Sequence, residues 1–272
     1  MRFSVGHITR FDFEQACGHS IHDVRLTPKP AAGQRILSWR IDGPGKRFDW
    51  TDGHGNEVTT FSVVGQHDAV EIAVAGLYEF SGGQHWLQYA DAPTLPAPFW
   101  LRNTGLARHD ASFDALIGGL AERAADPAQR VAALHELMAR VRGRIAYRTG
   151  VSSVDTSAAE ALARGAGVAQ DSAHVFIACC RRLGVPARYV SGYVRNDDGE
   201  LRVGRTSHSW AESWVPGLDW VGFDPANGIS PRGDSLRLAT GLDYRDAAPV
   251  SGRRIGGGDA RMTVSASVRA TD

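Results

Sequence analysis

The hydrophobic pattern of this chain changes its period near residue 91, and the change limits the folds open to it. Before that point, "RILSWRI" and "VEIAVAGLYEF" alternate at period two, which is typical of strands. After it, Val131, Leu134, Met138 and Val141 recur every three or four residues, which is typical of a helix. Between the two patterns lies the proline-rich "DAPTLPAPF", and proline lacks the amide that helices and central strands need.

We therefore expect an α+β chain in two parts. Residues 1–91 are predicted to form an N-terminal antiparallel β domain, residues 92–110 a proline-containing linker, and residues 111–272 a core of helices followed by strands. The segment "DGHGN" predicts a turn within the first part, and "NDDG" a turn within the core. At the end of the core, "RIGGGDAR" and the alternating "MTVSASVRA" predict a loop and one last strand.

Helix signals divide the first half of the core. One helix is expected to begin at Asp126, which can act as its cap. The next opens with Ser157 and Glu160 at capping-box spacing and closes at Gly165. A third runs through the apolar "AHVFIACCRRLG". Ala169 is therefore predicted to lie at a helix N-terminus.

Composition narrows the function classes. Lys plus Arg and Asp plus Glu both count 30, so no overall field favours nucleic acid or an anionic membrane as partner. Asp12 and Glu14 interrupt any signal-peptide core, and no apolar run is long enough to span a membrane, so we expect a cytoplasmic protein. Because Cys17, Cys179 and Cys180 show no CxxC spacing, we expect reduced thiols, no metal and no cofactor.

A histidine and an aspartate are expected on neighbouring strands. "SHSWAESWV" carries His208, and "DWVGFDP" carries Asp224. A nucleophile at a helix N-terminus, an imidazole and an orienting carboxylate together suit acyl transfer through a covalent intermediate. The helix terminus can lower the pKa of a cysteine there from about 8.5 to between roughly 3.5 and 7.5. At the expected position, however, this chain has Ala169.

Three segments, "AAEALARGAGVAQDSAHVFIACCRRLGVPARYVSGY", "SHSWAESWVPGLDWVGFDPANG" and "HSIHDVRLTPKP", resemble the bacterial transglutaminase-like proteins. The resemblance implies an N-terminal β region and a papain-like core, with a helix bundle packed on an antiparallel sheet. It also implies thiol peptidase, amidase or acyltransferase chemistry. The family motif reads G-V-C-Q-D, followed by S-H-x-W and F-D-P. By position, the catalytic histidine becomes His208, the aspartate becomes Asp224, and the nucleophilic cysteine is replaced by Ala169.

No nearby residue is a good substitute for that cysteine. Cys179 and Cys180 lie about 15 Å further along the expected helix, and we interpret them as small buried residues. Ser172 lies roughly 4.5 Å along the helix but about 60° around it. Asp171 is sufficiently explained as a first-turn carboxylate that the helix dipole favours.

Other suggestive residues have ordinary explanations. Gly165 and Gly167 lack the preceding strand and third glycine of a dinucleotide fingerprint. His7, His19 and His22 have no metal-ligand spacing and are interpreted as surface or packing residues.

Three functional hypotheses remain open. In the first, Ala169 is an engineered replacement of the cysteine of a thiol peptidase, amidase or transglutaminase-like acyltransferase. In the second, alanine is natural, and the protein is a pseudoenzyme that binds a peptide or protein. In the third, the β domain makes the chain a scaffold. The partner is expected to be a peptide, a protein or a small amide, while the substrate-binding residues and the oligomeric state stay open.

Overall fold

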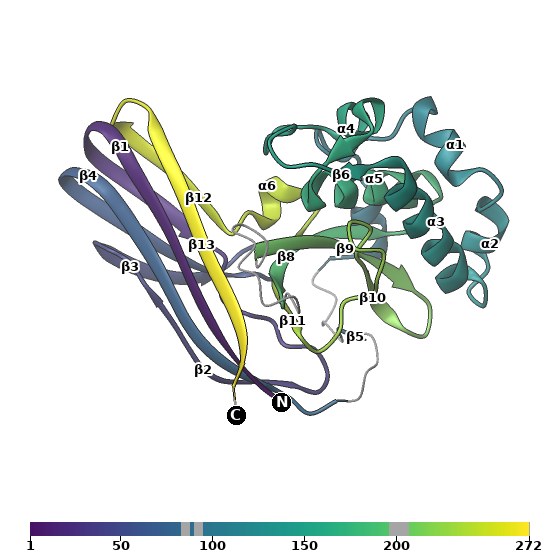
Figure 1. The fold of residues 1–272 in the computed structure, drawn as a ribbon, viewed down its shortest axis with the longest axis horizontal. Helices are drawn as coiled ribbons and strands as arrows, with labels where there is room; N and C mark the ends of the chain where they lie inside the picture. The colour runs from purple at the N-terminus through teal and green to yellow at the C-terminus, as the bar shows by residue number, and fades with distance from the viewer. Residues whose placement is uncertain (83–87, 90–94, 196–206, 272) are drawn as a thin grey trace.

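The computed structural model describes residues 1–82, 88–89, 95–195 and 207–271, and Figure 1 shows its arrangement. Two antiparallel sheets, called sheet A and sheet B below, account for most of the strands. Helices cover the face of sheet B that is turned away from sheet A (Figure 1). The predicted α+β architecture, with a β region followed by a helix-covered antiparallel sheet, is confirmed.

Sheet A is built around two very long strands. It contains β1 (Arg2–Val24), β2 (Gln34–Asp42), β3 (Lys46–Thr51), β4 (Glu57–Phe80), β12 (Val250–Gly256) and β13 (Ala260–Thr271). The central pair is β1 and β4; β12 and β13 follow the free edge of β1, while β2 and β3 follow that of β4.

Strand β1 bends back on itself. The rings of Phe11 and His22 lie 5.0 Å apart, although a fully extended strand would separate them by roughly 36 Å. The pairing register of β1 shifts between Asp12 and Cys17, where the strand turns over (Figure 1, upper left). The two halves of sheet A therefore enclose a shared apolar cluster, which includes Phe3, Val24, Phe61 and Ile72.

The last strands differ from the expected assignment. Residues 250–271 were expected to complete the core, but β12 and β13 pair with β1, from Arg2 with Thr271 to Val24 with Val250. The alternation in "MTVSASVRA" does predict a strand, but it carries no information about which distant strand is its partner. An unpaired long edge of β1 would expose a row of backbone donors and acceptors. The boundary predicted at Asp91 and the turn predicted at 196–199 lie outside the described residues.

Sheet B forms the centre of the molecule. It contains β5 (Gln88–Tyr89), β8 (Ala187–Val194), β9 (Ser207–Val215), β10 (Asp219–Phe223) and β11 (Ser235–Gly241), in the order β11-β8-β9-β10-β5. Three neighbouring strands share a buried ionic contact, because Glu212 Oε2 accepts hydrogen bonds from Arg188 Nε at 2.7 Å and Arg237 Nη1 at 3.1 Å. On the side of sheet A, Tyr193 and Leu236 join the apolar cluster of that sheet.

The helical elements follow the expected order, with one shifted start. They are η1 (Ala97–Leu101), η2 (Ala111–Phe113), α1 (Asp114–Ile117), α2 (Ala121–Ala125), α3 (Arg130–Arg144), α4 (Ala158–Arg164), α5 (Ala169–Arg182) and α6 (Tyr244–Ala247). A short parallel pair, β6 (Ala146–Tyr147) and β7 (Ala166–Gly167), lies between them. Asp126 does cap a turn, since its Oδ1 accepts the Ala128 amide and its carbonyl accepts the Arg130 amide, both at 2.9 Å, but the regular helix α3 begins later than expected, at Arg130. The capping box of α4 is confirmed, and Gly165 ends that helix at φ 69°.

Helix α5 lies inside the core. Nearly all of its residues are buried, including Val175, Phe176 and Ile177, and it packs against β9, α3 and α4. An apolar helix enclosed on all sides has few alternative positions. Its N-terminus is therefore held firmly relative to sheet B.

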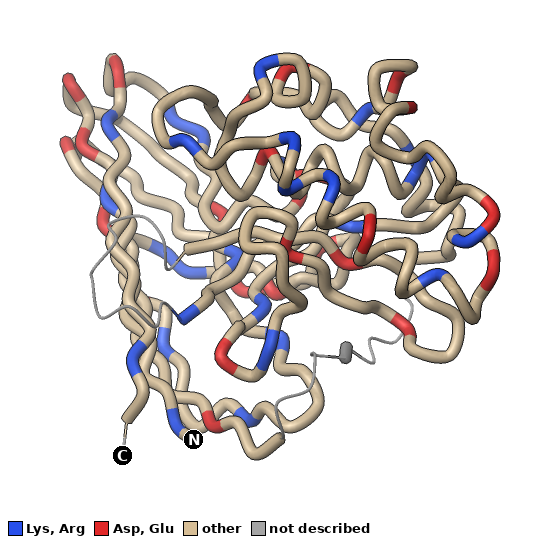
Figure 2. The backbone as a smooth tube through the Cα atoms, turned by 45° about the vertical axis from the view of Figure 1, so that its right-hand side comes forward, with Lys and Arg blue, Asp and Glu red and all other residues tan. Residues whose placement is uncertain are grey.

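Charged residues of both signs are spread over the tube in Figure 2, in keeping with their equal numbers. Within the described ranges, no helix combines the length and the apolar character needed to cross a membrane.

Candidate active site

The structure brings His208 and Asp224 together. His208 lies on β9 and Asp224 directly follows β10, and His208 Nε2 is 2.7 Å from Asp224 Oδ2. A carboxylate acceptor favours the tautomer with the proton on Nε2, which leaves Nδ1 able to accept a proton. Burial alone would raise the pKa of Asp224, but its contacts with His208 and Asn227 hold that pKa below its ordinary value. Asp224 is thus a buried, ionised partner for the imidazole.

Asn227 completes this pair, and the sequence analysis did not single it out. Its Nδ2 donates to Asp224 Oδ2 at 2.7 Å, while the backbone amides of Ala226 and Asn227 donate to Asp224 Oδ1 at 3.1 Å each. The signal was present in "DPAN", since an aspartate followed by proline favours a turn in which its carboxylate accepts backbone amides two and three residues later. These bonds fix the carboxylate in the orientation that meets His208.

Ala169 is the first residue of α5, as predicted. The helix start is tied to a neighbouring segment by Asp171, whose Oδ2 accepts hydrogen bonds from the Val168 amide at 2.7 Å and from Ser152 Oγ at 2.6 Å. Asp171 therefore does more than favour the helix dipole. First-turn amides have no acceptor within their own helix, and they give this end of α5 a partial positive charge beside Ala169.

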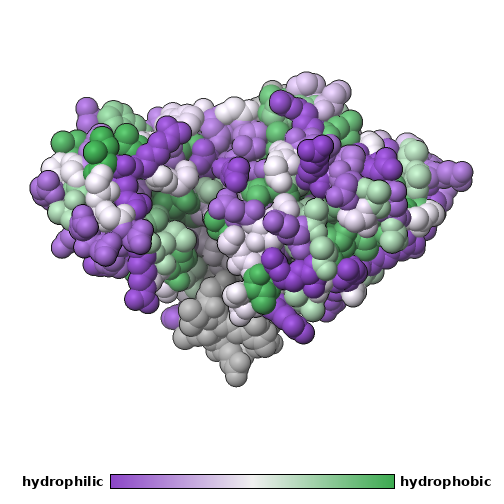
Figure 3. All heavy atoms as spheres, turned by 90° about the horizontal axis from the view of Figure 1, so that it is seen from above, coloured by the Kyte–Doolittle hydropathy of each residue, from purple (hydrophilic) through white to green (hydrophobic). Residues whose placement is uncertain are grey.

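Ala169, His208 and Asn227 line one cleft of about 850 Å³. One side of the cleft is formed by the start of α5 and by β8 and β9, and the other by β1, β12 and β13. Seen from above in Figure 3, the surface is hollowed between sheet A, at the left, and the core, at the right. The predicted positions of nucleophile and base thus face the same space.

The other candidate residues lie elsewhere. Ser172 is 3% exposed, and Cys179 and Cys180 are fully buried inside the core. Burial raises the pKa of Cys180 to about 12 and that of Cys179 well above its ordinary value, so neither thiol ionises near neutral pH. Among the described residues, no group of three or more His, Cys, Asp or Glu side chains is placed to hold a metal ion.

Two of the three histidines considered in sheet A are packing residues, and the third lines the cleft. His22 is buried against Phe11, and His19 contacts Ser62 Oγ at 3.1 Å. His7 is also buried, but it lines the cleft that contains Ala169. The sequence analysis missed this position, because it depends on the packing of β1 against β8.

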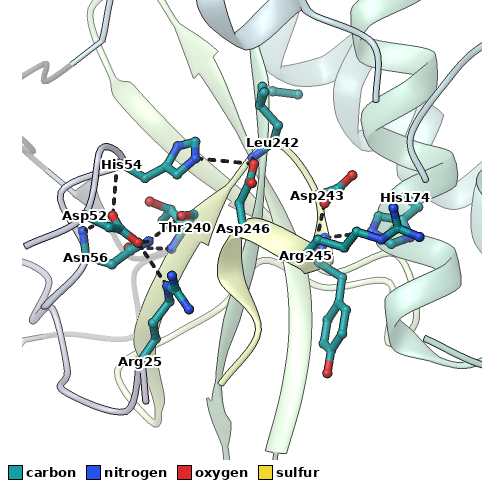
Figure 4. Close-up of polar contacts among 12 residues, drawn as sticks. Arg25, Asp52, His54, Asn56, His174, Thr240, Leu242, Asp243, Arg245 and Asp246 are labelled. Atoms are coloured by element: carbon teal, nitrogen blue, oxygen red, sulfur yellow. Dashed lines mark hydrogen bonds and ion pairs between the residues drawn. The ribbon is translucent and has the colours of Figure 1, made fainter. Parts of the chain in front are cut away.

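Two sets of polar contacts meet at α6, one from sheet A and one from α5 (Figure 4). The turn before β4 meets β11, where Asn56 Nδ2 donates to the Thr240 carbonyl at 2.8 Å and the Thr240 amide donates to Asn56 Oδ1 at 2.9 Å. In the same turn, His54 Nε2 lies 3.3 Å from the carboxylate of Asp246 on α6. The first residue of α6, Tyr244, donates its amide to His174 Nε2 on α5 at 3.1 Å. The turn predicted from "DGHGN" therefore joins the two parts of the molecule.

Together, the fold and the site define a class of protein. An imidazole and a buried carboxylate on antiparallel strands share a cleft with the N-terminus of a buried helix, which is the arrangement of a papain-like core. Residues 115–225 match the transglutaminase-like superfamily, and residues 3–79 match the bacterial transglutaminase-like N-terminal region. The chain belongs to the bacterial transglutaminase-like proteins.

Similar proteins extend over the same length. An uncharacterized protein of Mycobacterium leprae is 28% identical over 281 aligned positions, which cover 97% of this chain and 96% of that protein. An uncharacterized protein of Mycobacterium tuberculosis H37Rv is 28% identical over 274 positions, covering 92% and 87%. A solved structure from Cytophaga hutchinsonii, described as a candidate cysteine protease, has a TM-score of 0.74 and 20% identity and covers 100% of this chain and 92% of its own. It shares the fold.

Proposed function

We propose that this chain binds a peptide or amide group in the cleft between Ala169 and His208 and does not catalyse acyl transfer. The observation that carries the proposal is a methyl group at the first position of α5, in the same cleft as the His208–Asp224 pair. A methyl group cannot attack a carbonyl carbon, so the covalent route has no nucleophile. The cleft and the amides at the start of α5 can still bind a polar carbonyl group.

The fixed orientation of His208 beside Asp224 supports one further candidate function. Because Asn227 and two backbone amides orient Asp224, His208 is placed as the base of a thiol enzyme would be. A form of this chain with cysteine at position 169 would then be a thiol peptidase, amidase or transglutaminase-type acyltransferase.

The experiment that tests the site is alkylation of the Ala169→Cys variant by iodoacetamide as a function of pH. The thiolate attacks the methylene carbon, a C–S bond forms and iodide leaves, while His208 can take the thiol proton. We expect a thiol pKa below about 8.5, and a rise of the midpoint when His208→Ala is added. Gln170→Cys is the matched control, because its side chain also lines the cleft at the same helix end but one position away.

Each candidate function has a result that would contradict it. If the pH profiles of Ala169→Cys with and without His208→Ala coincide, no base is paired with position 169, and the thiol-enzyme candidate is wrong. If the unmodified protein turns over peptide amides or esters faster than a heat-inactivated sample does, it has a nucleophile other than residue 169.

A further inference from the structure

The side of the cleft that faces α5 belongs to sheet A. Thr9 on β1 is paired with Val264 on β13, and both side chains line the cleft that contains Ala169 and His208. Met262 lies two residues before Val264, so it is on the same face of the strand, and it also lines the cleft. These residues come from the two ends of the chain, and neither strand contributes to the papain-like core.

Thr9 is part of a buried hydrogen-bonded chain. The Tyr193 hydroxyl lies 2.8 Å from His7 Nδ1, and His7 Nε2 lies 2.7 Å from Thr9 Oγ1. Burial lowers the pKa of His7 to about 4, so its ring is neutral near pH 7 and carries one proton. Burial also raises the pKa of Tyr193, which keeps its hydroxyl protonated.

Both ends of this chain are closed to solvent. Thr9 is 1% exposed and Tyr193 is fully buried. The two hydrogen bonds therefore tie β1 to β8, and they fix the inner face of sheet A, with β13 paired to it, opposite the start of α5.

The rest of the lining has little charge. Gln170 and Asn227 contribute amides, and Tyr189, Ser191 and Ser209 contribute hydroxyls. Val264 and Met262 add apolar surface on the sheet A side. Within the described part of the lining, Arg195 is the one permanently charged side chain. Neutral donors and acceptors interleaved with aliphatic surface are complementary to a peptide with uncharged, aliphatic side chains.

We infer that the inner face of sheet A is the specificity wall of the cleft. Met262 and Val264 contact the aliphatic side chains of an uncharged peptide, and the buried Thr9, His7 and Tyr193 hold this face in position. This inference rests on the peptide-binding function proposed for the same cleft.

The test uses the Ala169→Cys background and two electrophiles. One is a neutral, acetylated tripeptide chloromethyl ketone with aliphatic side chains; the other is iodoacetamide, which is too small to need the wall. With the chloromethyl ketone, the thiolate displaces chloride from the methylene carbon and a C–S bond forms. We expect Val264→Trp to lower the ratio of the tripeptide rate to the iodoacetamide rate by about tenfold or more. Thr263→Trp, which faces the opposite side of β13, leaves this ratio unchanged.

Met262→Trp provides a second blocking variant at a half-exposed side chain, should Val264→Trp not fold.

The outcomes separate this inference from the proposed function. Equal ratios in Val264→Trp and Thr263→Trp, or faster labelling by a tripeptide with charged side chains, overturn the specificity wall even when the thiol is activated. An iodoacetamide profile that does not depend on His208 overturns the thiol-enzyme candidate instead, because that reagent reports on the paired base alone. A tripeptide rate that rises linearly with concentration, without saturation, in the Ala169→Cys background overturns the proposed peptide binding.

Discussion

His174 makes the stability of α5 depend on pH. The ring is fully buried, and burial, with a smaller contribution from Arg181, lowers its pKa to about 3. Its Nε2 accepts the amide of Tyr244, and its ring lies 5.0 Å from that of Tyr189. A protonated imidazole could not accept this hydrogen bond. The folded protein therefore requires the neutral form.

The sign and size of the effect follow from the two pKa values. In the unfolded chain the pKa of His174 has its ordinary value of 6.5. Below that pH the unfolded state therefore binds a proton that the folded state does not bind. The stabilising contribution is complete above about pH 6.5 and is lost as pH falls toward about 3. Between pH 7 and pH 5, one such histidine lowers the free energy of unfolding by about 2 kcal/mol.

Urea unfolding at pH 7 and pH 5 measures this loss. In His174→Gln, the side-chain carbonyl can accept the Tyr244 amide without titrating, so the difference between the two pH values should shrink by about 2 kcal/mol. His19→Gln controls for replacing a histidine as such, because His19 is only partly buried, beside Ser62. A His174→Gln variant that loses as much stability as the unsubstituted protein between pH 7 and pH 5 would refute the reasoning.

Two further predictions concern the junction and the thiols. Asn56→Ala leaves the buried amide and carbonyl of Thr240 without the partners that Asn56 provides, and it should lower the free energy of unfolding by about 3 kcal/mol in urea titrations. Asn103→Ala, at an exposed asparagine, is the control. Equal losses of stability in the two variants would contradict the role of Asn56. Cys179 and Cys180 should react with iodoacetamide only as the protein unfolds, because both are fully buried with raised pKa values. Mass spectrometry of the labelled native protein checks this, and rapid labelling at pH 7 would contradict it.

Much of the site could be predicted because its determinants are local. The capping box at Ser157, the helix start at Ala169 and the strand that carries His208 each depend on residues within a few positions of one another. The contact between His208 and Asp224 followed from two adjacent antiparallel strands, whose pairing a short connection strongly favours.

The parts of the site that could not be predicted depend on contacts between segments far apart in the sequence. Thr9 reaches the cleft only because β1 packs against β8, and its partner Val264 lies at the other end of the chain. Asn56 contacts Thr240 across a comparable separation. The period of a strand predicts which residues share a face, but not which sheet the strand joins.

The pairing of β1 with β13 also sets an order of events during synthesis. β1 leaves the ribosome before the helices and sheet B, and β13, which pairs with it from Arg2 to Phe13, leaves after them. Until then one edge of β1 is open to other chains, at the stage when nascent proteins are most prone to associate. The cleft gains its final wall at the same moment. A polypeptide that stalled before residue 260 could fold the helices and the His208–Asp224 pair and still present a half-open groove.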